Sequence, residues 1–172
     1  EYYVNDAGRQ IDLLLVSVLL CHLGKNKHIF VDEKSNDDSH LVTYKGNYVN
    51  DVAISLSHDL EKIDKDSVFN LLNEPIDSLI SFLKNHKSYS QIRNALVNVI
   101  IDEYINEDLS AVGINFDSWF RESQLYETGL LDEVLLNIKN KNLSYRKDGA
   151  LWFKNTKFGD DQDRVLIKKN GD

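Results

Sequence analysis

Three carboxylates near the end of the chain are the most conspicuous candidates for metal chemistry. Asp160, Asp161 and Asp163 lie within four residues, and hard divalent cations bind clustered carboxylates. An EF-hand-like loop also requires a glycine at its sixth position and a terminal glutamate, and both are missing here. The interpretation we favour is therefore a solvated connection between two strands, and we expect no metal site.

A nucleophile and a base stand next to each other at Cys21 and His22. Adjacent side chains on a helix point about 100° apart, so these two do not face each other. The remaining histidines show no metal-ligand spacing, and a single cysteine can form neither an internal disulfide nor a zinc framework. They are His28, His40, His58 and His86. Phosphate-loop, dinucleotide-binding and nucleophile-elbow motifs are also absent from the sequence.

Two polar clusters remain as candidate binding sites. Asn5 and Asp6 follow an apolar segment, at the place where open α/β sheets bind ligands, although a simple capping turn explains them equally well. The last 30 residues hold seven basic side chains against five acidic ones, and on a strand Arg164 and Lys168 would share a face. That face could contact phosphates, but solvated strand residues are the favoured interpretation.

The composition is that of an ordinary globular protein. The chain has 172 residues, of which 42% are hydrophobic and 28% charged, with a formal charge of −8. This charge argues against non-specific nucleic-acid binding, but it is compatible with one local contact. The single cysteine fits a reducing cytoplasmic setting. The longest apolar run, residues 11–23, is too short to cross a bilayer, so no membrane partner is expected.

The first residues predict half of a βαβ unit. Residues 1–4 favour a buried strand and residues 5–8 a turn. From Ile11 onward apolar residues surround a helix on all sides, which predicts that neighbours cover it. The parallel neighbour of the strand is expected outside the chain. The absence of methionine and the start at Glu1 also predict a piece of a longer protein.

The rest of the chain divides into helical and extended segments. Residues 24–42 predict an exposed, mobile loop, and apolar periodicity predicts three helices within residues 46–112. Further on, we expect an extended segment at 115–120, a helix around 131–138, and strands at 150–153 and 164–167. Asn170-Gly171 predicts a hairpin turn.

Several sequence blocks resemble bacterial arginyl-tRNA synthetases, and they occur in the same order. The blocks are residues 1–11 (EYYVNDAGRQI), Glu122-Ser123, Leu125-Tyr126 with Gly129, residues 148–153 (DGALWF) and residues 158–168 (FGDDQDRVLIK). Residues 24–112 are variable, and Tyr44, Gly46 and Tyr48 match less well. The resemblance implies a class I aminoacyl-tRNA synthetase that activates arginine with ATP and magnesium and transfers it to the 3′ end of its tRNA.

The resemblance also implies an α/β fold and a domain organisation. Residues 1–23 would be a strand and helix of a Rossmann-type catalytic domain, residues 24–114 a helical insertion, and residues 115–172 an α/β part of that insertion with a β-hairpin. The family's H-I-G-H-type, K-M-S-K-type and T-Y-x-x-D-I-A-Y-H-type segments are missing. We therefore assign no catalytic residue and expect the fragment alone to be inactive.

The resemblance turns the two polar clusters into specific hypotheses. Asn5, Asp6 and Gln10 are expected at the edge of the substrate pocket, and Arg164 and Lys168 are expected to contact RNA, with Lys169 as a weaker candidate. Removing the other sheet strands should leave apolar surface on which the fragment self-associates. The alternative is a stand-alone, non-catalytic RNA-binding or interaction module derived from such an insertion.

Overall fold

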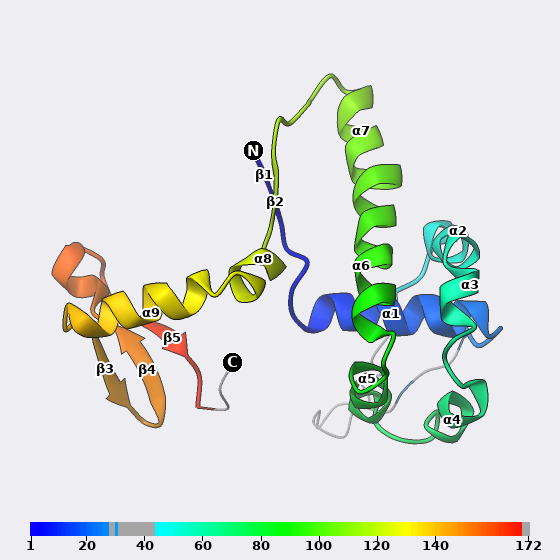
Figure 1. The fold of residues 1–172 in the computed structure, drawn as a ribbon, viewed down its shortest axis with the longest axis horizontal. Coiled ribbons are helices and arrows are strands. Elements are labelled where there is room, and N and C mark those ends of the chain that lie inside the picture. The colour runs from blue at the N-terminus through cyan, green and yellow to red at the C-terminus, as the bar shows by residue number, and fades with distance from the viewer. Residues whose placement is uncertain (28–29, 31–43, 170–172) are drawn as a thin grey trace. The chain divides into compact units, whose positions relative to one another are not determined.

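The chain forms two compact units. The computed structural model describes residues 1–27, 30 and 44–169, so most of the expected loop at 24–42 lies outside the described residues (Figure 1). Unit 1 comprises Glu1–Tyr2 and Asp6–Trp119, and unit 2 comprises Tyr3–Asn5 and Phe120–Asp172. The predicted boundaries at residues 23 and 114 concern a longer protein and stay a prediction.

The first strand finds its neighbour within the chain. Strands β1 (Tyr2–Val4) and β2 (Trp119–Arg121) form a two-stranded sheet. The backbone N–H of Tyr2 donates to the carbonyl of Ser118 at 2.8 Å, and that of Glu122 donates to Val4 at 3.0 Å. The residue numbers of the hydrogen-bonded partners therefore increase in the same direction along both strands, so the two strands are parallel. The expectation that the parallel neighbour lies outside the chain is wrong.

Helix α1 (Arg9–His22) is buried on most sides, as its sequence predicts. Residues 14–20 are all buried, and the helix packs against α2 (Asn47–Ser55), α5 (Ile76–Lys84) and α6 (Tyr89–Ile100). These three helices are the ones that the periodicity predicted. They cover most of the apolar surface of α1, and self-association of the fragment stays a prediction.

Unit 1 contains further helices that the sequence did not reveal. They are α3 (Ser57–Leu60), α4 (Lys65–Asn70), the π-helix η1 (Ile101–Ile105) and α7 (Asn106–Ala111). Helices α6, η1 and α7 follow one another without a break and form one continuous helical segment (Figure 1). Elements of four to six residues are too short to show a helical period, which explains why they were missed.

Unit 2 carries a three-stranded antiparallel sheet. After α8 (Ser123–Glu127) and α9 (Leu130–Asn140), the strands β3 (Ser144–Lys147), β4 (Ala150–Phe153) and β5 (Arg164–Ile167) pair in the order β3-β4-β5. The 3₁₀ helix η2 (Asn155–Phe158) precedes the turn into β5. The predicted helix and two predicted strands are confirmed, whereas β3 was missed. The Asn170-Gly171 turn lies outside the described residues.

A two-residue turn joins β3 to β4. Lys147 pairs with Ala150, and between them Asp148 and Gly149 have φ angles of 53° and 83°. Two successive positive φ angles are typical of the type I′ hairpin turn, for which Asp-Gly is a preferred sequence. This turn, which the DGALWF block contains, indicates why the polar segment Ser144–Lys147 becomes a strand.

The hydrophobic core lies in unit 1. Its buried cluster includes Leu15, Leu19, Leu79 and Leu96, whereas Val4 alone is buried among the described residues of unit 2. The mixed α/β character, rich in helix with a small antiparallel element, is confirmed. Among the described helices, none combines the length and apolar character that a bilayer span requires.

Truncating a side chain in the α1 core should be far more costly than truncating one in α9. Leu19 is 1% exposed and Leu136 is 57% exposed. Because Leu19→Ala leaves a cavity, we expect it to lower the free energy of unfolding by about 2–5 kcal/mol. The control Leu136→Ala should change it by less than about 0.5 kcal/mol. Urea denaturation followed by circular dichroism measures both values, and equal losses would contradict the assignment of the core.

Candidate functional site at the amino end of helix α1

A glycine marks the junction between the first turn and helix α1. Gly8 has φ 82° and ψ −174°, a backbone conformation that residues with a side chain rarely adopt. A Cβ at this position would meet no atom within 4 Å, so the requirement for glycine is conformational rather than steric. Gly8 also provides no side-chain cap for the helix.

A buried carboxylate connects α1 to two neighbouring helices. The Asp12 side chain is only 4% exposed, and its Oδ2 accepts from Lys84 Nζ of α5 at 2.8 Å. Its Oδ1 accepts from the hydroxyl of Tyr89 of α6 at 2.5 Å. A buried charge is costly unless it is paired and hydrogen-bonded, and both conditions are met here. Asp12 also lies in the first turn of α1, where the helix dipole favours negative charge.

The Tyr89 hydroxyl is held in its protonated, donating form. Burial is the main cause that raises the pKa of Tyr89, and the hydrogen bond to Asp12 and the charge of Asp12 add to it. The Arg93 guanidinium acts in the opposite direction on this pKa. Because the pKa of Tyr89 lies above its ordinary value, the hydroxyl can donate to Asp12 at every physiological pH.

A second residue of α6 contacts the turn itself. Arg93 lies one helical turn after Tyr89 and donates from Nη2 to the backbone carbonyl of Asp6. Asp6 is 1% exposed, so its carbonyl belongs to a buried part of the backbone that requires hydrogen-bond partners. Nearby on α1, Arg9 forms an ion pair with Asp77 of α5, and both of these side chains are about half exposed.

Tyr44 makes hydrogen bonds to two residues of α1, one exposed and one buried. Its hydroxyl donates to Gln10 Oε1 at 2.7 Å, and its backbone N–H donates to Ser17 Oγ at 2.9 Å. Ser17 in turn donates to the carbonyl of Leu13 at 2.7 Å. The amide of Gln10 is thus oriented by a partner while the residue remains exposed.

The predicted RNA-contact residues lie at the two ends of β5. Arg164 donates to both carboxylate oxygens of Asp160 at 3.2 Å and to Asp161 at 3.4 Å. This guanidinium is the main cause that holds the pKa of Asp160 well below its usual range. Lys168 follows the strand and is exposed. The positive charge of Arg164 is therefore largely balanced, whereas that of Lys168 faces solvent.

The third carboxylate of the cluster is also satisfied by the protein. Asp163 accepts from the backbone N–H of Thr156 at 3.0 Å, from its hydroxyl at 2.9 Å and from the Tyr145 hydroxyl at 2.9 Å. The bond from the Thr156 N–H is the largest cause that lowers the pKa of Asp163. Within residues 1–27, 30 and 44–169, no group of three or more potential ligands gathers around a common point.

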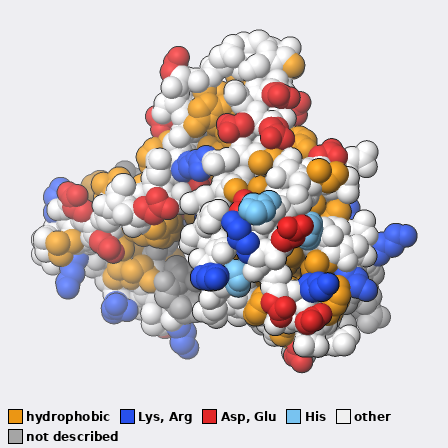
Figure 2. All heavy atoms as spheres, turned by 45° about the vertical axis from the view of Figure 1, so that its right-hand side comes forward, with side chains coloured by type: hydrophobic (Ala, Val, Ile, Leu, Met, Phe, Trp, Pro, Cys, Tyr) orange, Lys and Arg blue, Asp and Glu red, His pale blue; other side chains and the backbone are white. Residues whose placement is uncertain are grey.

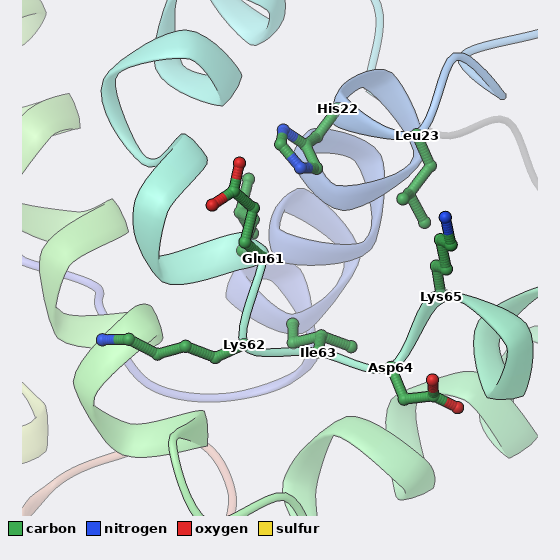
Figure 3. Close-up of a pocket in the computed structure, with 8 residues that line it drawn as sticks. His22, Leu23, Glu61, Lys62, Ile63, Asp64 and Lys65 are labelled. Atoms are coloured by element: carbon green, nitrogen blue, oxygen red, sulfur yellow. The ribbon is translucent and has the colours of Figure 1, made fainter.

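A hollow of about 530 Å³ lies at the opposite, carboxyl end of α1 (Figure 3). Figure 3 shows the side chains of Lys62 and Asp64 pointing in opposite directions, both away from His22, so these two charged groups do not meet. On the face drawn in Figure 2, acidic and basic side chains are interspersed rather than gathered by sign. The hollow is lined by His22, Leu23, Leu60, Glu61, Lys62, Ile63, Asp64 and Lys65.

Comparison of the sequence with known proteins finds relatives that share one name. The chain is 34% identical over 181 residues to an arginine–tRNA ligase of Acidithiobacillus ferrooxidans and 33% identical over 191 residues to one of Legionella pneumophila. Each comparison covers 99% of this chain. The chain is related to arginine–tRNA ligases. It spans about 30% of the length of these curated relatives. No family model matches the chain.

A solved structure supports the same relationship. The chain superposes with a TM-score of 0.64 and 27% identity on a crystal structure from Campylobacter jejuni that is provisionally described as an arginyl-tRNA synthetase. The comparison covers the whole of this chain and 32% of that one. The resemblance to arginine–tRNA ligases that the sequence blocks indicated is therefore confirmed.

The structure places the three residues that were predicted to contact the substrate in different surroundings. Asp6 and Gln10 both lie in unit 1 at the amino end of α1, whereas Asn5 is exposed and belongs to unit 2. Sequence reasoning missed Asp12, although a lone carboxylate within an apolar helix indicates a paired, buried charge. It also missed three partners that come from distant segments, namely Lys84, Tyr89 and Arg93.

Removing the Tyr89 hydroxyl should destabilise unit 1 more than removing the Tyr145 hydroxyl destabilises unit 2. Tyr89→Phe leaves the buried Asp12 carboxylate without one donor, and we expect the free energy of unfolding to fall by about 1.5–3 kcal/mol. Tyr145→Phe removes a hydrogen bond to Asp163 at a half-buried site, where Thr156 still donates two hydrogen bonds to the carboxylate, so its cost should be clearly smaller. Urea titrations compare the two, and a smaller loss for Tyr89→Phe would contradict the role given to Asp12.

Proposed function

We propose that this chain is part of a cytoplasmic arginine–tRNA ligase, which activates arginine with ATP and transfers it to the 3′ end of its tRNA. The observation that carries this proposal is the similarity of 99% of the chain to proteins named arginine–tRNA ligase. The polar turn after β1 supports it, because open α/β sheets bind ligands at the carboxyl ends of parallel strands, and β1 has a parallel neighbour.

Within that ligase, we assign residues 1–23 to the Rossmann-type catalytic domain, residues 24–114 to its helical insertion, and residues 115–172 to the α/β part of the insertion. Strand β1 and the buried helix α1 that follows it support the first assignment. The helices from α2 to α7 and the antiparallel sheet of β3, β4 and β5 support the other two.

The chemistry of activation is an in-line attack of the arginine carboxylate on the α-phosphate of ATP, and pyrophosphate leaves with its magnesium. Positioning and charge neutralisation carry most of such a reaction. In this chain, Asn5, Asp6 and Gln10 would contribute to positioning at the edge of the pocket. Gln10 suits this role because Tyr44 orients its amide while the residue remains exposed. No residue of this chain is assigned a direct role in phosphate transfer.

Activity of the complete ligase tests this assignment. With the double variant Asn5→Ala and Gln10→Ala, we expect the KM for arginine to rise about tenfold, since losing a positioned hydrogen bond to a charged substrate costs on the order of 1.5 kcal/mol. The measurement is arginine-dependent exchange between pyrophosphate and ATP. Gln162→Ala, at an exposed loop position, serves as the matched control and should leave this KM unchanged.

Two results would contradict the proposal in different ways. A complete protein that shows no arginine-dependent exchange, with or without saturating tRNA, would exclude ligase activity. Exchange with an unchanged KM in the double variant would remove Asn5 and Gln10 from the pocket edge but leave the activity in place. We expect the 172-residue chain by itself to show no exchange above a blank without protein.

We further propose that β5 contributes to tRNA binding through Arg164 and Lys168. Lys168 is exposed, whereas Arg164 is shared with Asp160 and Asp161, so Lys168 should contribute more. Each lost phosphate contact should flatten the slope of log affinity against log salt by about 0.7–0.9.

Filter binding of tRNA to the complete ligase at several salt concentrations measures this slope. Lys168→Ala should flatten the slope by nearly the 0.7–0.9 or so expected for one lost phosphate contact, and Arg164→Ala should flatten it by less. Lys65→Ala, which changes an exposed lysine of unit 1, should leave the slope unchanged. Identical slopes for all three variants would show that β5 only presents a solvated face.

A further inference from the structure

We propose that Arg93 is a positioning residue that holds the Asp6–Gly8 turn in the geometry required for arginine binding. This inference rests on the proposed function, because it assigns a role to a residue behind the proposed pocket edge. Arg93 lies on α6, more than 80 residues after the turn, and it donates to the backbone carbonyl of Asp6. That bond depends on the position of the backbone and not on which side chain stands at residue 6.

Helix α6 makes one contact with the turn before α1 and one with the first turn of α1 itself. Arg93 contacts the backbone at Asp6, and Tyr89 contacts the side chain of Asp12. Residues four apart lie on the same face of a helix, so a single face of α6 makes both contacts. Gln10, which we place at the pocket edge, lies in sequence between the two contact points. The segment that carries it is therefore held on both sides by one helix.

The contacts form a continuous network rather than two isolated bonds. The guanidinium of Arg93 interacts electrostatically with the Tyr89 hydroxyl, which donates to Asp12, and Asp12 also accepts from Lys84 of α5. The order of the network is thus the Asp6 carbonyl, Arg93, Tyr89, Asp12 and Lys84. A change at Arg93 removes one contact of the turn, whereas the salt bridge between Asp12 and Lys84 can still hold α1 against α5.

The planar fork of arginine explains why this residue type suits the site. A guanidinium presents several N–H donors in fixed directions, so one side chain can bond the carbonyl and remain close to the Tyr89 hydroxyl. Lysine would supply the charge without the fork.

The test separates positioning from stability in the complete ligase. We expect Arg93→Ala to raise the KM for arginine in pyrophosphate exchange at least tenfold, because small displacements of positioning groups are costly. Arg93→Lys should recover part of this loss, and kcat should change less than the KM. Arg146→Ala, an exposed arginine of β3, is the matched control and should behave like the unsubstituted enzyme.

A second control removes stability without touching the network. Val68 of α4 is fully buried, so Val68→Ala should lower the melting temperature while leaving the KM for arginine unchanged. If Val68→Ala raises this KM as much as Arg93→Lys does, or if no Arg93 variant changes it, the positioning role is overturned. Absence of exchange in the unsubstituted complete ligase would overturn the proposed function as well, so the two failures are distinguishable.

Discussion

The organisation of unit 1 depends on one buried charge. Helix α1 is apolar around most of its circumference, yet it carries Asp12 with a carboxylate that solvent scarcely reaches. Such a charge is stable only beside suitable donors, and these come from Lys84 of α5 and Tyr89 of α6. The apolar residues of α1 favour burial against many possible neighbours. The carboxylate restricts the choice, because it fixes which ends of α5 and α6 lie beside the start of α1.

The same constraint reaches the turn before α1. Because Tyr89 and Arg93 share a face of α6, the helix that pairs with Asp12 also brings a guanidinium to the Asp6 carbonyl. The turn is thereby held against the buried core of unit 1.

Local patterns in the sequence predicted local structure well. Helices α1 and α5 and strands β4 and β5 each follow from a period within a few residues. Pairings between distant residues could not be predicted in this way. Nothing within residues 2–4 indicates that residues 119–121 will lie beside them, and Ser144–Lys147 becomes a strand because the Asp148-Gly149 turn folds it onto β4. The candidate site shows the same limit, since Asp6 and Gln10 were predicted but Arg93 was not.

The most direct test is a double-mutant cycle for the bond between Asp12 and Tyr89. The free energy of unfolding is measured by urea denaturation for the unsubstituted chain, Asp12→Ala, Tyr89→Phe and the double variant. If the buried carboxylate organises the start of α1, the two substitutions should couple by about 1–3 kcal/mol, since residues that share one buried network are not additive. A coupling below about 0.3 kcal/mol would show that Asp12 and Tyr89 act independently and would contradict the central role of this charge.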